Sequence, residues 1–146
     1  NSGRILFMIY FDNKKIGCIG NGGYDKKNNS SRLDNMMKDP LCNLPGAMTI
    51  VEKVYLKWMF DDLKLSKITG FLFSDNSRMM KIHKKCGWII TDVVPIKKIF
   101  TEEETRWEEI TTKSNNENVE RHFNKIELTR ENIMKNFDDI KYRLLV

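Results

Sequence analysis

A capped helix between two short apolar segments constrains the fold of this chain more than any other feature. Lys67–Ser74 is a short, very apolar segment rich in strand-forming residues, and Trp88–Val94 is another. Between them, Asn76 is a residue type that caps helices, about three turns of helical sequence follow, and Gly87 can end the helix. The order strand, helix, strand predicts an α/β arrangement in which helices cover a sheet.

A longer amphipathic helix is predicted upstream of this unit. Between Gly46 and Leu63 the apolar residues recur at three- and four-residue spacing; they are Ile50, Val51, Val54, Tyr55, Trp58 and Met59. A strand is predicted over Arg32–Lys38, and Asp39-Pro40 ends it. Because the connection onward to Lys67–Ser74 is long and helical, the two strands are expected to be parallel neighbours with a right-handed crossover.

Further strands are predicted towards both ends of the chain. Arg4–Phe11 and Lys15–Gly20 have the spacing of a β-hairpin, and residues 21–23 and 26–31 have loop composition. After Pro95 a charged turn is predicted at residues 102–104.

The last part of the chain is predicted to add two strands and a helix. The strands are Arg106–Thr112 and His122–Leu128, with residues 114–118 between them. Thr129 can cap the helix, whose apolar stripe is Ile133, Met134, Phe137 and Ile140.

The composition is that of one globular domain over residues 1–146. Hydrophobic residues are 40% and charged residues 31%, and no apolar run approaches the ~18 residues of a membrane span. The start, Asn1-Ser2-Gly3-Arg4, lacks the features of a signal peptide and an initiator Met, so a processed product or part of a longer polypeptide is expected. Three distant cysteines favour a reducing, cytoplasmic setting, and two histidines do not make a zinc site, so no metal is expected.

The net charge of +5 is unevenly distributed. Residues 1–100 contain 17 Lys and Arg against 9 Asp and Glu, whereas residues 101–146 contain 8 against 11. A basic first part suits an anionic ligand, either nucleic acid or a phosphate-bearing cofactor. Aromatic residues do not interleave with the basic ones, which disfavours nucleic acid, and most of the lysines are expected on a solvated surface.

The residues that lead into the long helix form a candidate phosphate site. They are Asn43, Leu44, Pro45, Gly46, Ala47, Met48 and Thr49. A helix N-terminus presents unpaired backbone N–H groups and the positive end of the helix dipole, and Gly46 would allow close backbone approach. The alternative is an ordinary strand-to-helix loop with Pro45 near the first helical position.

These segments together resemble the acetyl-CoA-binding half of the GNAT superfamily of N-acetyltransferases. The resemblance rests on the pieces G-A-M-T-I, K-W-M-F-D-D-L-K-L, F-L-F-S-D-N and I-H-K-K-C-G-W, and it is greatest to enzymes that acetylate nucleotide-linked 4-amino sugars in pseudaminic acid synthesis. It covers residues 5–95 and, more loosely, 106–128.

The resemblance implies a GNAT-like α/β fold, which some schemes class as α+β. Its centre would be a mixed, mostly antiparallel sheet with two splayed parallel strands, flanked by helices. Residues 1–95 would form the acetyl-CoA-binding half, and residues 96–146 the C-terminal strands and terminal helix. The strand and helices with which the family begins have no counterpart in this chain.

The chain departs from the family's pattern at three positions. Met48 stands where the phosphate loop usually has a small residue, Met79 replaces an alanine, and His83 replaces the usual tyrosine. A bulky Met48 is expected to crowd the phosphate site, although the backbone N–H groups remain.

The resemblance also implies roles for individual residues. His83 would donate a proton to the leaving thiolate of CoA, and a backbone N–H near Met36 or Met37 would stabilise the oxyanion. Acetyl-CoA would be held by Met36, Met37, the seven residues from Asn43 to Thr49, Ser74, Asn76, Met79 and Lys81. The simpler alternatives are core packing for the methionines, a helix cap for Asn76, a surface charge for Lys81 and no role for His83.

The general base stays open among Asp75, Glu108, Glu109 and a water chain. The leading interpretation is an N-acetyltransferase that acts on the amino group of a UDP- or dTDP-linked amino sugar, without nucleic acid, membrane or metal, and able to form a homodimer. An acetyltransferase for protein or ribosomal N-terminal amines shares the fold. A non-catalytic CoA-binding module is the alternative from another class, and a nucleic-acid-binding domain is a distant further one.

Overall fold

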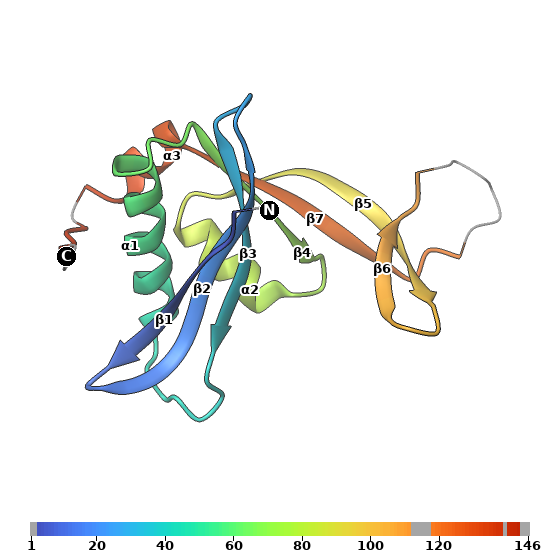
Figure 1. The fold of residues 1–146 in the computed structure, drawn as a ribbon, viewed down its shortest axis with the longest axis horizontal. Helices are drawn as coiled ribbons and strands as arrows, with labels where there is room; N and C mark the ends of the chain where they lie inside the picture. The colour runs from blue at the N-terminus through green and yellow to red at the C-terminus, as the bar shows by residue number, and fades with distance from the viewer. Residues whose placement is uncertain (1–2, 112–117, 139, 144–146) are drawn as a thin grey trace.

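The computed structural model describes residues 3–111, 118–138 and 140–143, and its strands form one mixed sheet (Figure 1). The sheet order is β1-β2-β3-β4-β7-β5-β6. In chain order the elements are β1 (Ile5–Phe11), β2 (Lys14–Asp25), β3 (Ser30–Lys38), α1 (Ala47–Asp61), β4 (Lys67–Phe73), α2 (Ser77–Lys85), β5 (Ile89–Phe100), β6 (Thr105–Glu109), β7 (Arg121–Thr129) and α3 (Arg130–Asn136).

The parallel pair predicted from the sequence lies at the centre of this sheet. β3 and β4 run parallel, with Ser30 opposite Lys67 and Leu33 opposite Gly70, and α1 connects them. The other strand pairs are antiparallel. The fold is therefore the GNAT-like mixed sheet with flanking helices that the sequence predicted.

Several strand bounds differ from the prediction. β2 continues to Asp25 through residues 21–23, because its pairing with β3 absorbs two register shifts instead of ending in a loop. β5 continues to Phe100, past Pro95, which pairs with His122 of β7 and accepts a hydrogen bond from Ile110 N–H at 2.9 Å. A proline is tolerated there because only its carbonyl is used.

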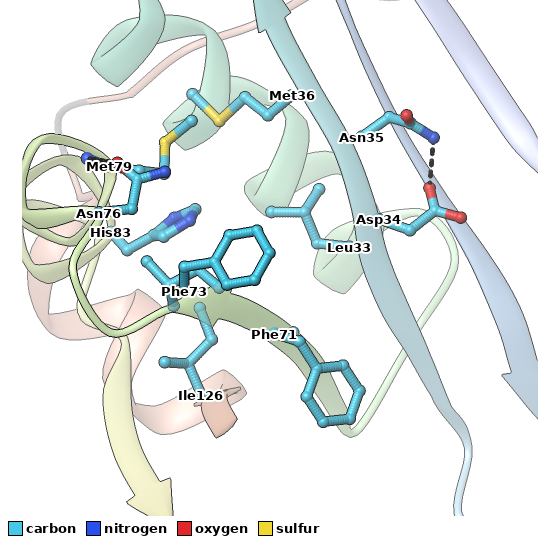
Figure 2. Close-up of a pocket in the computed structure, with 12 residues that line it drawn as sticks. Leu33, Asp34, Asn35, Met36, Phe71, Phe73, Asn76, Met79, His83 and Ile126 are labelled. Carbon is cyan, nitrogen blue, oxygen red and sulfur yellow. Dashed lines mark hydrogen bonds between the residues drawn. The ribbon is translucent and has the colours of Figure 1, made fainter. Parts of the chain in front are cut away.

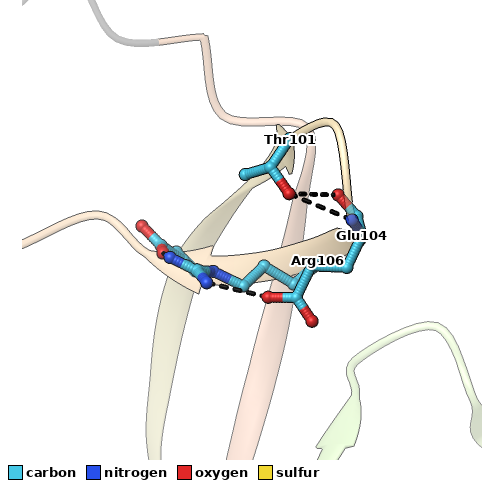
Figure 3. Close-up of polar contacts among 4 residues, drawn as sticks. Thr101, Glu104 and Arg106 are labelled. Atoms are coloured by element: carbon cyan, nitrogen blue, oxygen red, sulfur yellow. Dashed lines mark hydrogen bonds and ion pairs between the residues drawn. The ribbon is translucent and has the colours of Figure 1, made fainter.

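The turn between β5 and β6 is the charged turn expected at residues 102–104. Thr101 Oγ1 donates to the Glu104 carbonyl at 3.0 Å and accepts from Glu104 N–H at 3.0 Å (Figure 3). Arg106 then bonds Glu104 Oε1 at 2.8 Å and, through Nε, Glu108 Oε1 at 2.7 Å. These exposed ion pairs order the hairpin tip and contribute little stability. Thr112, and residues 114–117 of the connection predicted next, lie outside the described residues.

The core lies on the face of the sheet that the helices cover. It joins Leu56, Met59 and Phe60 of α1 to alternate residues of the strands, such as Ile68 of β4 and Leu128 of β7. Alternation along a strand sends every second side chain to this face. α3 completes the core with Ile133, and Phe137 follows directly after the helix.

The terminal helix matches its prediction in part. Thr129 is the N-cap residue, but its side chain makes no capping hydrogen bond. Ile133 and Phe137 are buried, whereas Ile140 lies beyond the helix and is partly buried against the core. The side chain of Met134 lies outside what the structure describes.

The buried face of α1 is rotated from the predicted stripe. Ile50, expected to face the core, is 60% exposed, whereas Glu52 is 0% exposed. Buried polar groups require hydrogen-bond partners, and Glu52 has them on neighbouring elements. The apolar spacing alone could not reveal this.

A buried polar chain holds α1 against β2 and β3. The Tyr55 hydroxyl donates to Asn21 Oδ1, Asn21 Nδ2 donates to Ser31 Oγ at 2.5 Å, and Ser31 Oγ donates to the Gly22 carbonyl at 3.0 Å. Burial, with a smaller effect of Asp34, raises the pKa of Tyr55. Every member has a partner, which a polar group in a core needs.

Within the described residues, no helix is long and apolar enough to span a membrane. Cys18, Cys42 and Cys86 are all free thiols.

We expect Phe60→Ala to lower the free energy of unfolding by about 3–5 kcal/mol, because a fully buried ring leaves a cavity. Urea unfolding followed by circular dichroism measures the change. The matched control on the same helix is Ile50→Ala, which should change the free energy by less than about 0.5 kcal/mol. Equal effects of the two changes would mean that α1 packs in another rotation.

Candidate active site

The two parallel strands separate after four residue pairs, and a pocket opens where they part. β3 continues alongside β2 to Lys38, and β4 continues alongside β7 to Phe73, so beyond Leu33 and Gly70 the facing strand edges are not paired with each other. The pocket encloses about 220 Å³ and is lined by Leu33, Asp34, Asn35, Met36, Gly70, Phe71, Leu72, Phe73, Asn76, Met79, His83 and Ile126. A space of this size suits a narrow chain rather than a whole nucleotide.

Figure 2 shows how α2 closes one side of this pocket. Asn76, Met79 and His83 come from the start and inner face of α2, and Phe71 and Phe73 come from β4. Unpaired backbone N–H and C=O groups on the strand edges need partners, and an extended ligand with amide groups can provide them as an added strand does.

His83 lies in the pocket wall and is fixed by a buried carboxylate. Its side chain is 5% exposed, and Nδ1 lies 2.6 Å from Glu52 Oε1. A carboxylate at that distance accepts a hydrogen bond from Nδ1–H, which leaves Nε2 as the nitrogen available to the pocket. No other described group bonds Nε2, so one ring nitrogen is fixed by Glu52 and the other is free to contact a ligand.

Glu52 is a buried residue beside the pocket that sequence reasoning missed. The same oxygen, Oε1, accepts a hydrogen bond from Trp88 Nε1 at 2.7 Å, and Oε2 has no hydrogen-bond donor among the described residues. The Cys86 thiol lies nearby, and burial, followed by the Glu52 charge, raises its pKa. The signal available in the sequence was a single acidic residue inside an apolar helix stripe.

Asn76 has the capping role that its position predicted. Its Oδ1 accepts a hydrogen bond from Met79 N–H at 3.1 Å, and Gly87, with a φ of 95°, follows the end of the helix. Asn76 also lines the pocket. The cap fixes where α2 begins and therefore where Met79 and His83 lie.

The candidate phosphate loop lies between the carboxyl end of β3 and the start of α1. Gly46 is the N-cap residue with a φ of 78°, and a Cβ at this position would meet nothing within 4 Å. Its backbone is thus in the left-handed region that favours glycine. Met48, expected to crowd the loop, is buried and points into the core instead.

The other residues of this loop do not line the pocket. Ala47 N–H already donates to the Leu44 carbonyl at 3.3 Å, and Thr49 N–H donates to the Gly46 carbonyl at 3.1 Å. Asn43 and Pro45 are exposed. A helix N-terminus remains, but some of its donors are used within the turn.

Four predicted contact residues come together in the pocket, and three others lie elsewhere. Those within the lining are Met36, Asn76, Met79 and His83. Met37, next to Met36 on a strand, points to the opposite face, where it lines a second hollow with Leu6 and Cys18. Ser74 and Lys81 are exposed and do not line the pocket.

The carboxylates considered as a general base are engaged in ion pairs. Arg121 bonds Asp75 through Nε at 2.9 Å and Nη2 at 2.7 Å, and these hydrogen bonds hold the pKa of Asp75 below its ordinary value. Glu108 pairs with Arg106, and Glu109 pairs with Lys125. None of the three lines the pocket, whereas Asp34 does.

An aromatic cluster continues from the pocket across the sheet face that the helices leave open. Phe73 stacks on Phe123 with centroids 4.9 Å apart and meets Trp107 edge-on at 5.7 Å. The Arg121 guanidinium lies 3.8 Å from the centre of the Phe73 ring. Phe71, also in the pocket wall, lies 6.3 Å from Phe123.

Among the described residues, no group of three or more His, Cys, Asp or Glu side chains could hold a metal ion.

Replacement of Asn76 should show how much its side-chain oxygen stabilises the start of α2. Asn76→Ala removes the acceptor for Met79 N–H and should lower the free energy of unfolding by about 1 kcal/mol. Asn76→Asp keeps a capping oxygen and should unfold as the wild type does, which urea unfolding measures. Destabilisation by both changes would mean that the side-chain amide, and not the capping oxygen, matters.

Comparison with known proteins finds similar solved structures but no similar family or curated sequence. No protein-family model matches the chain, and no curated protein sequence does. Among solved structures it is similar to a spermidine N-acetyltransferase from Vibrio cholerae in complex with CoA and spermine, with a TM-score of 0.68 and 12% identity over 90% of this chain and 68% of that chain. It is also similar to the Campylobacter jejuni N-acetyltransferase PseH, with a TM-score of 0.59 and 18% identity over 89% of this chain and 70% of that chain. These similarities show that the chain has the fold of the GNAT acetyltransferases.

Proposed function

We propose that the protein is an acetyl-CoA-dependent N-acetyltransferase. The observation that carries the proposal is the pocket between separated parallel strands, with the His83 ring in its wall and Nε2 available. The solved spermidine N-acetyltransferase with the same fold was crystallised with CoA, which supports CoA as the carrier of the acetyl group.

The residues present fit the shape of such a ligand. The pantetheine arm, an extended chain with amide groups, would lie between the edges of β3 and β4, where Met36 and Met79 provide flexible apolar contacts. The phosphates would lie at the N-terminus of α1, near Gly46. The narrow pocket would then hold the pantetheine arm and the thioester, and the nucleotide would lie outside it.

The chemistry would be direct acetyl transfer to a neutral amine. The nitrogen attacks the thioester carbonyl, a C–N bond forms, and the C–S bond breaks with its electrons on sulfur. The attacking nitrogen loses one proton and the sulfur gains one, so that the products are the acetamide and the CoA thiol; His83 Nε2, once protonated, would supply the proton to the sulfur. An N–H group on the β3 edge near Met36 would stabilise the oxyanion.

The acceptor would approach from the open face of the sheet, where the aromatic cluster meets the pocket. Phe71 and Phe73 belong to both, so a ligand stacked on these rings would lie beside the thioester. Arg32 lies 5.9 Å from the Phe71 ring centre and Lys98 lies 5.9 Å from that of Trp107, so cations surround the rings.

Aromatic rings with neighbouring cations suit a planar base linked to phosphates. The acceptor proposed is therefore a nucleotide-linked amino sugar. The resemblance of the sequence to enzymes that act on such sugars supports the same choice.

The activity should appear as release of CoA thiol that depends on both acetyl-CoA and an amine. We expect turnover with a UDP- or dTDP-4-amino sugar, and the same assay should include spermine and a peptide with a free N-terminus. Turnover with only spermine or the peptide would exclude the sugar acceptor. Tight acetyl-CoA binding without thiol release from any amine would instead indicate a binding module.

Loss of the His83 ring should slow the chemical step. We expect His83→Gln, whose amide can still donate to Glu52, to lower kcat on the order of 10²-fold and to leave the KM for acetyl-CoA nearly unchanged. Thiol release under saturating substrates measures this. An unchanged kcat would exclude His83 as the proton donor.

Loss of a ring from the aromatic cluster should weaken binding of the acceptor amine and leave binding of acetyl-CoA unchanged. Phe73→Ala is expected to raise the KM for the amine about 10-fold, the loss of a stacking contact of about 1–3 kcal/mol, without raising the KM for acetyl-CoA. Tyr10→Ala, on the exposed edge strand β1, is the matched control and should change neither constant. A rise in the KM for acetyl-CoA alone would place the acceptor elsewhere.

A further inference from the structure

We infer that Glu52 is a positioning residue that makes His83 a proton relay between the attacking amine and the leaving sulfur. The inference rests on the proposed function. It adds a second task for His83, as acceptor of the amine proton, and it assigns a role to a carboxylate that the predicted site did not contain.

The first support is that two side chains from different elements donate hydrogen bonds to the same oxygen of Glu52. Glu52 on α1 accepts hydrogen bonds at Oε1 from His83 Nδ1 on α2, at 2.6 Å, and from Trp88 Nε1 directly before β5, at 2.7 Å. The three residues are 0%, 5% and 3% exposed. A carboxylate held by two donors has a fixed position, so it keeps the His83 ring in one orientation and one tautomer, with the proton on Nδ1 and a lone pair on Nε2.

The second support is that, among the described residues, no Lys or Arg pairs with the buried carboxylate, whose ion-pair partner is His83. Trp88 donates a neutral N–H, and the Cys86 thiol is kept neutral because burial and Glu52 raise its pKa. Lys53, the neighbour of Glu52 on α1, reaches the Phe137 ring, with its Nζ 5.4 Å from the ring centre. Tyr55, one turn on, bonds Asn21 on β2.

A buried carboxylate that has no fixed cation beside it is costly, and a cation that forms beside it lowers that cost. Among the described groups that hydrogen-bond to Glu52, His83 is the one that can become a cation. Glu52 therefore favours an imidazolium that forms during the reaction, by the logic of a carboxylate behind a catalytic histidine.

The proton balance of the step is complete. As the C–N bond forms, the amine proton moves to Nε2, and Glu52 stabilises the resulting imidazolium through Nδ1. As the C–S bond breaks, sulfur takes the proton from Nε2, and His83 returns to its neutral form. The products are the acetamide and the CoA thiol, and the carboxylates in ion pairs are not needed as a base.

The test is Glu52→Gln, which keeps the size of the side chain and removes its charge. We expect kcat for thiol release to fall on the order of 10²-fold, with the KM for acetyl-CoA within about twofold of the wild type. A kcat within twofold of the wild type would overturn the inference.

Tyr55→Phe is the matched control. It removes a buried hydrogen bond from the same helix, the one to Asn21, without touching His83 or Glu52, so it should lower the melting temperature but keep kcat within threefold of the wild type. If it lowers kcat as much as Glu52→Gln does, Glu52 acts only through the stability of the scaffold, and the inference is wrong.

A spectroscopic measurement tests the tautomer without any turnover. The chain has two histidines, so ¹⁵N NMR of the imidazole in a His122→Gln background observes His83 alone. We expect the wild type to show protonated Nδ1, and Glu52→Gln to gain the form protonated at Nε2.

A wild-type ring protonated only at Nε2 would overturn the inference, even where Glu52→Gln fails to fold. A correct tautomer in a protein that releases no thiol would instead contradict the proposed function alone.

Discussion

The separation of β3 from β4 is the constraint on which the rest of the molecule depends. The strands pair over four residues and then follow different neighbours, β2 and β7. Each leaves a stretch of backbone edge without a strand partner inside the sheet, which ordinary sheets avoid. α2 follows β4 and begins at this opening, so its N-terminus lies together with the pocket, Met36 and Met79.

Glu52 connects the pocket to the packing of the helices, because it lies on α1 and bonds His83 of the pocket wall on α2. Without it, α2 would contact α1 through apolar side chains alone, and the His83 ring would have no fixed rotation. Because the carboxylate binds both α2 and the residue before β5, a shift of either element disturbs the ring. Burying a carboxylate costs free energy, and its hydrogen bonds to His83 and Trp88 offset part of that cost.

Short sequence patterns predicted those features of the fold that a short segment of the chain determines. The Asn76 cap, the Gly87 stop and the parallel crossover each depend on residues close in sequence, and each is found where it was expected. The rotation of α1 depends instead on partners 31 and 36 residues away, so an apolar stripe that included Ile50 and excluded Glu52 was wrong. The extension of β5 past Pro95 depends likewise on β7.

The candidate site was predictable to the same limited extent. Met36, Asn76, Met79 and His83 meet in one pocket. Met37 does not, because adjacent residues on a strand face opposite ways, and choosing between them requires the register with β2. Asp34 and the aromatic cluster were not foreseen, since their position depends on which strands are neighbours.

The contact between Glu52, His83 and Trp88 also limits how this sequence can change. Loss of either ring or of the carboxylate leaves a buried polar group without its partner, which costs more free energy than removing both members of a pair. Substitutions at the three positions should therefore be better tolerated in combination than one at a time.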